Sequence, residues 1–116
     1  MANELTISAA IAYAKSGATV NRSVPSASHT ISGTAVAQGV ASIATSDTTI
    51  TNVAAPGYVF VKNLDATNYV QVGPDATNWF IKLKATQWAI FPINGTALHA
   101  KANTAACDLE YIVFSL

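Results

Sequence analysis

Residues 65–84 read Asp65-Ala66-Thr67-Asn68-Tyr69-Val70-Gln71-Val72-Gly73-Pro74 and then Asp75-Ala76-Thr77-Asn78-Trp79-Phe80-Ile81-Lys82-Leu83-Lys84. They contain one pattern twice: a polar Asp-Ala-Thr-Asn turn that leads through an aromatic residue into an alternating strand. Asp and Asn favour turns because their side chains bond the backbone just ahead. Successive turns of a meander lie at opposite ends of a sheet. We therefore expect that Asp65 and Asp75 form no catalytic carboxylate pair and share no metal ion.

Short strand signals recur along the rest of the chain. Residues 58–62 are rich in β-branched and aromatic residues, which suit a pleated surface. Residues 5–15 alternate with period two before a turn at Ser16-Gly17, and Pro25 predicts the start of another short strand. Taken together, these signals predict about eight to ten short strands and no convincing helix. The pattern predicts an all-β chain, an antiparallel β-sandwich of which a jelly roll is one form, with 1–116 as a single domain.

The composition predicts association with other protein. Only 10% of the 116 residues are charged, against roughly 25% in an average domain. Such a chain is either a monomer with a surface prone to association or a subunit that hides much of its surface in an assembly; the net charge of zero promotes association, so we expect a homo-oligomer. Without a Lys/Arg cluster we expect no nucleic-acid partner, and without an apolar run near ~20 residues we expect no membrane span. Residues 1–16 are the candidate for an N-terminal arm or exchanged edge strand.

The residue types needed for catalysis are scattered. His29 and His99 stand alone in the sequence, and the lone Cys107 has no nearby histidine. We expect His99 to be solvated and Cys107 to be a small buried residue. No metal-binding or nucleophile motif occurs. The sequence therefore predicts a protein that is not an enzyme, with no catalytic residues, no metal and no cofactor.

The two tryptophans have two interpretations. Trp79 and Trp88 stand at period-two spacing from Ile81 and Ile90, which favours burial in the core. The alternative is a platform on which a sugar ring stacks.

Other aromatic residues stand on strand faces that also carry lysines. Tyr58 and Phe60 share a face with Lys62, and Phe80 shares one with Lys82 and Lys84. Apolar side chains on an exposed face are typical of an interaction patch. The predicted partner surface therefore consists of Tyr58, Phe60, Lys62, Phe80, Lys82 and Lys84.

Three segments carry a resemblance to a known group of proteins. They are residues 54–70, which include Pro56-Gly57-Tyr58 and Lys62-Asn63-Leu64-Asp65, residues 80–91, and the ending Leu109-Glu110-Tyr111. This sequence resembles small β-sandwich virion proteins of tailed bacteriophages, well over the C-terminal half and, in the N-terminal half, mainly at Ala12-Tyr13-Ala14-Lys15-Ser16-Gly17-Ala18.

The resemblance implies a non-enzymatic structural component of the virion, present in the host cytoplasm during assembly. We expect a capsid decoration (cement) protein that binds the major capsid protein or another virion protein. The alternatives are a component of the tail, baseplate or fibre, and a carbohydrate-binding β-sandwich module.

Overall fold

The structure is a computed structural model that describes residues 4–31, 35–50, 56–93 and 97–115. Its ten strands are β1 (Leu5–Lys15), β2 (Ala18–His29), β3 (Val36–Ile43), β4 (Thr48–Ile50), β5 (Pro56–Asn63), β6 (Val70–Gly73), β7 (Ile81–Leu83), β8 (Trp88–Pro92), β9 (Leu98–Ala102) and β10 (Cys107–Ser115). All strand pairs are antiparallel. These ranges contain no helix, and hence no helix long and apolar enough to cross a membrane. The predicted all-β class is confirmed.

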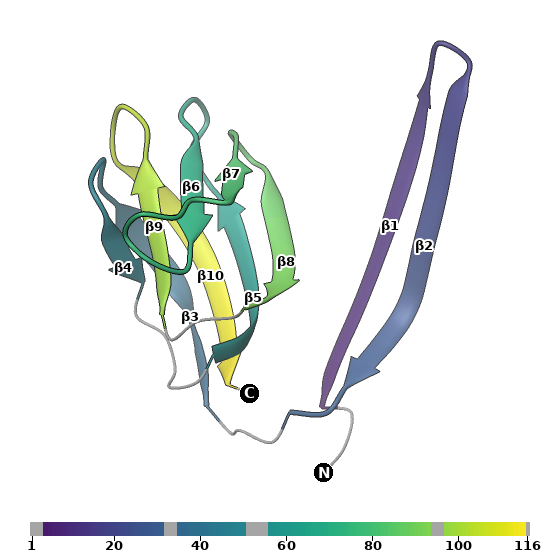
Figure 1. Ribbon diagram of the computed structural model, residues 1–116, viewed down its shortest axis with the longest axis horizontal. Coiled ribbons are helices and arrows are strands. Elements are labelled where there is room, and N and C mark those ends of the chain that lie inside the picture. Colours follow the sequence, from purple (N-terminus) through teal and green to yellow (C-terminus); the bar gives the residue numbers. More distant parts are fainter. Residues whose placement is uncertain (1–3, 32–34, 51–55, 94–96, 116) are drawn as a thin grey trace. The chain divides into compact units, whose positions relative to one another are not determined.

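The chain divides into two compact units, residues 1–32 and 33–116. The first contains β1 and β2, which form a two-stranded hairpin (Figure 1). Ser16 and Gly17 connect them with φ angles of 52° and 83°. Two successive positive φ values give a turn whose twist matches that of the flanking strands. The predicted turn at Ser16-Gly17 is therefore confirmed.

A bulge interrupts the hairpin ladder in the middle of β2. Ile7 pairs with Ala27, whereas Ala9 pairs with Val24, so Pro25 and Ser26 together oppose Ser8. Proline lacks the N–H that a regular ladder needs, and a bulge is one of the few places in a strand that tolerate it. The prediction that a separate strand begins at Pro25 was wrong, because β2 continues through Pro25 by way of the bulge.

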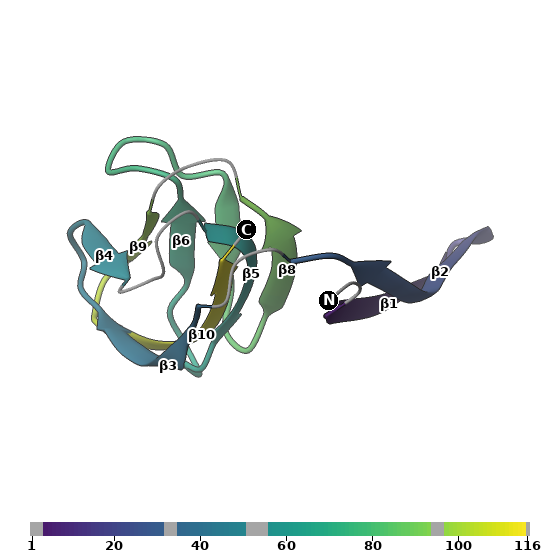
Figure 2. The ribbon, with the colours of Figure 1, turned by 90° about the horizontal axis from the view of Figure 1, so that it is seen from below.

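The second unit is a sandwich of two four-stranded sheets, in the orders β3-β10-β5-β8 and β4-β9-β6-β7 (Figures 1 and 2). The pairs are nested: β6 with β7, β5 with β8, β4 with β9 and β3 with β10. Two further ladders, β10 with β5 and β6 with β9, close the sheets. Eight strands rolled up in this order form a jelly roll, which is the form of sandwich that the sequence left open.

The core lies between the two sheets, and both contribute to it. Its fully buried residues are Ile43, Ile50, Val59, Val61, Val70, Val72, Leu83, Leu98, Ala100, Ala102, Cys107, Leu109 and Val113. The C-terminal strand β10 is apolar on both faces and lies between β3 and β5. Flanking strands pair its backbone groups on both sides, but only one of its apolar faces enters the core; the other, with Ile112 and Phe114, lies on the outward side of the sheet.

One buried polar side chain links the two sheets. Asn63 ends β5, and its Nδ2 donates to the carbonyls of Asn68 at 2.8 Å and Leu83 at 3.0 Å. Its Oδ1 accepts from the N–H of Asp65 at 2.9 Å. Since Leu83 belongs to β7 of the opposite sheet, this amide ties β5, the following turn and β7 together.

We expect Asn63→Leu to destabilise the sandwich by about 3 kcal/mol. The substitution keeps the volume but leaves several backbone groups without their partners, each at a cost of about 1–3 kcal/mol. Chemical denaturation followed by tryptophan fluorescence measures the loss. Asn21→Ala, at an exposed position of the hairpin, is the control and should change the free energy of unfolding by less than about 0.5 kcal/mol. A variant at position 63 as stable as this control would contradict the role of the amide.

Candidate interaction surface

The outward side of the β3-β10-β5-β8 sheet carries a broad set of apolar side chains, which we call the apolar sheet face. It consists of Val36, Val40, Tyr58, Phe60, Trp88, Ile90, Ile112 and Phe114. The strand registers place these residues in rows across the sheet. One row joins Ile112 to Phe60 and Phe60 to Ile90, and another joins Phe114 to Tyr58. The face is therefore continuous across all four strands.

Several side chains of this face are well exposed. Val36 is 55% exposed and Trp88 57%. The rings of Phe60 and Trp88 lie 6.4 Å apart between centroids and are tilted by 35°. An exposed apolar surface that spans a whole sheet is more typical of a contact site than of a solvated surface.

Charge on the apolar sheet face is sparse and lies at one end of it. Lys62 is directly opposite Glu110 in the ladder between β5 and β10. Asp108, two residues before Glu110 on β10, is exposed. Lys62 and Glu110 stand between Trp88 and Val40 in one row, with Asp108 beyond them, so these three residues form a polar border at this end of the face.

The prediction that both tryptophans occupy the core was wrong. Trp88 shares a face with Ile90, as the spacing indicated, but that face is the outer one and both residues are exposed. Period-two spacing shows which residues share a face without showing which face is buried. Trp79 precedes β7 and is only half-buried, with the Lys101 Nζ 5.5 Å from the centroid of its ring.

The six residues of the predicted partner surface divide between the two sheets. Tyr58, Phe60 and Lys62 lie together on the outward side of β5, half-buried among their neighbours. The other three, Phe80, Lys82 and Lys84, lie in or beside β7, which belongs to the opposite sheet. The structure therefore joins the first three to the apolar sheet face and places the second three elsewhere.

The outward side of the β4-β9-β6-β7 sheet is polar. Lys82 holds its Nζ 4.2 Å from the centroid of the Tyr69 ring, a cation–π contact. His99 is half-buried, and its Nδ1 lies 2.8 Å from Asp47 Oδ1, within the distance of a hydrogen bond or ion pair. The prediction that His99 is a solvated side chain was therefore wrong. Asp47 comes from the β3–β4 connection, far from His99 in the sequence, which is why the sequence did not reveal the pair.

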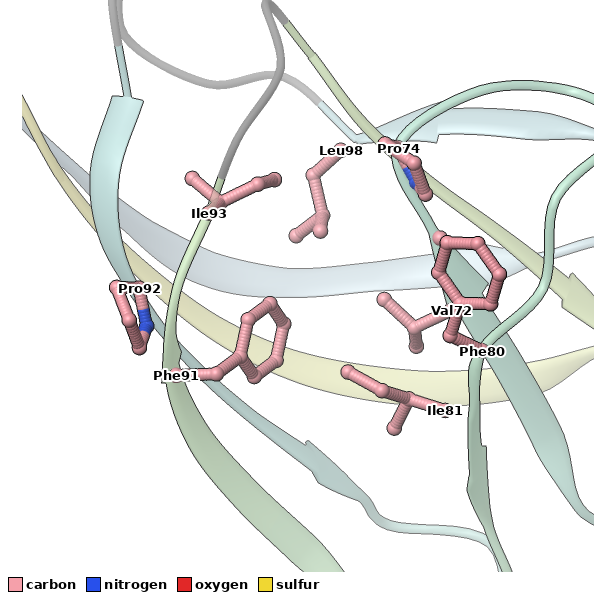
Figure 3. A pocket seen from close by; sticks show the side chains of 9 residues that line it. Val72, Pro74, Phe80, Ile81, Phe91, Pro92, Ile93 and Leu98 are labelled. Carbon is pink, nitrogen blue, oxygen red and sulfur yellow. The ribbon is translucent and has the colours of Figure 1, made fainter.

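A cavity of about 470 Å³ lies between the sheets at the ends of β6, β7 and β8 (Figure 3). Its wall includes Val72, Phe80, Ile81, Phe91 and Leu98. All of its described lining residues are apolar, and Figure 3 shows the Phe80 and Phe91 rings bordering the same space. Phe80 is nevertheless 80% exposed. The cavity can take an apolar group but offers no side chain for acid–base chemistry.

A second, open groove of about 610 Å³ runs along β7 and the start of β8. Phe80 and Lys82 line it together with Gln87 and Trp88. Two residues of the predicted partner surface therefore meet Trp88 here, and the groove combines aromatic rings with polar side chains.

Cys107 is buried in the core, as predicted. Burial, with smaller contributions from Asp65 and Asp108, raises the pKa of its thiol. A higher pKa keeps the sulfur protonated and unreactive at neutral pH. Among the described residues, no group of three or more His, Cys, Asp and Glu side chains is placed to hold a metal ion.

The two Asp-Ala-Thr-Asn turns lie at either end of β6, and each aspartate is used inside its own turn. Asp65 Oδ2 accepts from the N–H groups of Thr67 at 2.9 Å and Asn68 at 2.6 Å. Asp75 Oδ1 accepts from the N–H groups of Thr77 and Asn78, both at 2.8 Å. These carboxylates hold turns in place.

The pKa of Asp75 is lowered from 3.8 to about 2, first by the hydrogen bond from the Thr77 N–H and then by the Asn78 and Thr77 side chains. The backbone N–H groups of Asn68 and Thr67 lower that of Asp65. In each turn the donors favour the charged carboxylate, so the turn is most stable when its aspartate is ionised.

We expect the sandwich to lose stability as the pH falls from 3.8 towards 2. A folded-state pKa below the unfolded value gives stability that is complete above the unfolded pKa and lost as the pH falls through the folded pKa. Thermal unfolding across this range measures the loss. Asp75→Asn should make the melting temperature depend less steeply on pH in this acid range, and Asp65→Asn should act in the same direction. If the melting temperatures of both variants depended on pH as steeply as that of the unaltered chain, the ionisation of these aspartates would not contribute to stability.

One signal could have identified part of the apolar sheet face from the sequence. In residues 107–115, Ile112 and Phe114 alternate with Tyr111 and Val113, which shows two apolar faces, one of which must lie outward in a sandwich. The strand pairing that brings Trp88 beside Phe60 was not readable from the sequence, because ladder partners depend on topology.

No protein-family model, no curated protein and no solved structure matches this chain.

Proposed function

We propose that this chain is a non-enzymatic structural protein of a tailed-bacteriophage virion, a capsid decoration (cement) protein that binds the major capsid protein and stabilises the head shell. Its place is the virion, after assembly in the host cytoplasm. The observation that carries the proposal is the apolar sheet face, which spans a whole sheet of a domain with 10% charged residues. Such a surface is suited to permanent contact with other protein.

Two further observations support this function. Residues 54–70 resemble segments of small virion proteins, and here they form β5, with Tyr58 and Phe60 on the apolar sheet face, and the turn that Asn63 holds. The jelly-roll order of the sheets is also shared by many viral capsid domains, although the same fold occurs in lectins.

We expect the chain to be present in purified particles at on the order of hundreds of copies, because a decoration protein repeats with the symmetry of the shell. Quantitative mass spectrometry against the major capsid protein measures the ratio. Heads assembled without the chain should break at a lower temperature and regain stability when the purified chain is added. Small multiples of three or six copies would instead indicate a tail, baseplate or fibre component. Absence from the particle would overturn the virion assignment.

A second function, carbohydrate binding, is favoured by the groove beside Trp88. An exposed indole can stack on a sugar ring while Gln87 and Lys82, which line the same groove, supply polar contacts. Many proteins combine such an aromatic platform with a few polar groups in an open site.

If the groove binds glycans, Trp79→Phe should retain the fluorescence response because Trp88 is then the remaining indole. Trp88→Phe should lose the response, since the platform itself is changed. Fluorescence titration across a broad glycan panel measures both variants. A spectrum of the Trp79→Phe variant that no glycan changes would exclude this second function.

A further inference from the structure

The two sides of the hairpin differ in the polarity of their side chains. On β1, every second residue from Leu5 faces the same way, and the strand register adds the partners from β2. The side that we call the apolar hairpin side carries Leu5, Ile7, Ile11, Tyr13, Val20 and Val24, and the charged residues on it are Lys15 and Arg22. The opposite side carries mainly Thr, Ser, Asn and Ala. The bulge at Pro25 keeps Val24 and Val20 on the apolar hairpin side.

This apolar hairpin side is exposed. Ile11 is 63% exposed and Val20 53%. A two-stranded hairpin by itself is marginally stable in water, because each strand needs a second layer on which to bury its apolar side. A hairpin of eleven- and twelve-residue strands with this pattern therefore requires a covering surface.

The apolar sheet face has the dimensions needed to cover the apolar hairpin side. A two-stranded ribbon of this length covers roughly 35 Å by 10 Å. The β3-β10-β5-β8 sheet is roughly 19 Å wide, and its longest strand of nine residues extends roughly 30 Å. The sheet can therefore receive most of the hairpin, in the way that the two layers of a sandwich pack.

The charges on the two surfaces are complementary. The apolar hairpin side carries two cationic residues: Lys15 lies at its turn end, and Arg22 lies within it, directly opposite Ile11. The border of the apolar sheet face carries Glu110 and Asp108 beside a single lysine. Glu110 and Asp108 can pair with the cationic side chains of the hairpin, whereas a hairpin packed against another hairpin would bring Lys15 and Arg22 of both copies into one contact.

We propose that the apolar hairpin side of one copy packs on the apolar sheet face of a second copy, and that the exchange is reciprocal. One such contact hides roughly 350 Å² on each side, whereas two related by a two-fold axis hide roughly 700 Å² per partner, close to the roughly 800 Å² of stable complexes. Reciprocal exchange also gives a closed dimer. The inference rests on the self-association included in the proposed function, and it names the two surfaces responsible.

The test uses the purified full-length chain in sedimentation experiments over a range of concentrations. The unaltered chain should be a dimer. Ile11→Glu on the apolar hairpin side and Ile90→Glu on the apolar sheet face should each raise the dimer dissociation constant on the order of 100-fold, because each buries a carboxylate in the contact. Ala12→Glu, on the opposite hairpin side, is the matched control and should leave the dimer intact. Both isoleucines are exposed in the single chain, so tryptophan fluorescence should show a folded sandwich in every variant.

A photo-crosslinking residue at position 13 identifies the partner surface. With two differently tagged versions mixed, crosslinks should join the two tags and map to β5, β8 or β10. A monomer at all concentrations, a dimer unaffected by Ile11→Glu, or crosslinks confined to one chain or to a second hairpin would each overturn the inference. The result is independent of the particle experiment, because the chain can dimerise and be absent from virions, or be present there as a monomer.

Discussion

The pairing of β6 with β7 is the constraint on which the sandwich depends, because the β5–β8, β4–β9 and β3–β10 pairs are nested around it. The two Asp-Ala-Thr-Asn turns fix this centre from both ends, through carboxylates that bond the backbone of their own turns. Asn63 then joins β5 to β7 across the two layers. A buried amide is favourable here because both its nitrogen and its oxygen are hydrogen-bonded to backbone groups.

The same nested order of strands determines which side chains of the sandwich are exposed to solvent. Once β10 lies between β3 and β5, one of its two apolar faces enters the core and the other turns outward. The outward face aligns with those of its neighbours, and the result is a sheet with an apolar side in contact with solvent. The opposite sheet has short strands and carries lysines and a His99–Asp47 pair on its outer side. The domain is therefore polar on the outer side of one layer and largely apolar on the outer side of the other.

Much of the fold was predictable because its strands carry local signals, whereas the surfaces depended on contacts that the sequence does not show. Alternation located β1, and the run of β-branched and aromatic residues located β5. The orientation of Trp88 was misjudged, because alternation leaves inside and outside undetermined until the partner strands are known. Nothing in the sequence distinguished Asn63, because its bond to Leu83 of β7 depends on the tertiary structure. Asp47 and His99 meet across about fifty residues of chain, so spacing could not reveal them.

The bulge in the hairpin restricts the alignment of its two strands. Strands rich in alanine and serine can slip past each other at little cost, because neighbouring side chains are nearly interchangeable. A slip would move Pro25 into a ladder position that demands an N–H, which proline cannot supply. One alignment is therefore selected, and every copy of the chain displays an identical arrangement of side chains. Such uniformity is a requirement for any assembly built from many equivalent contacts.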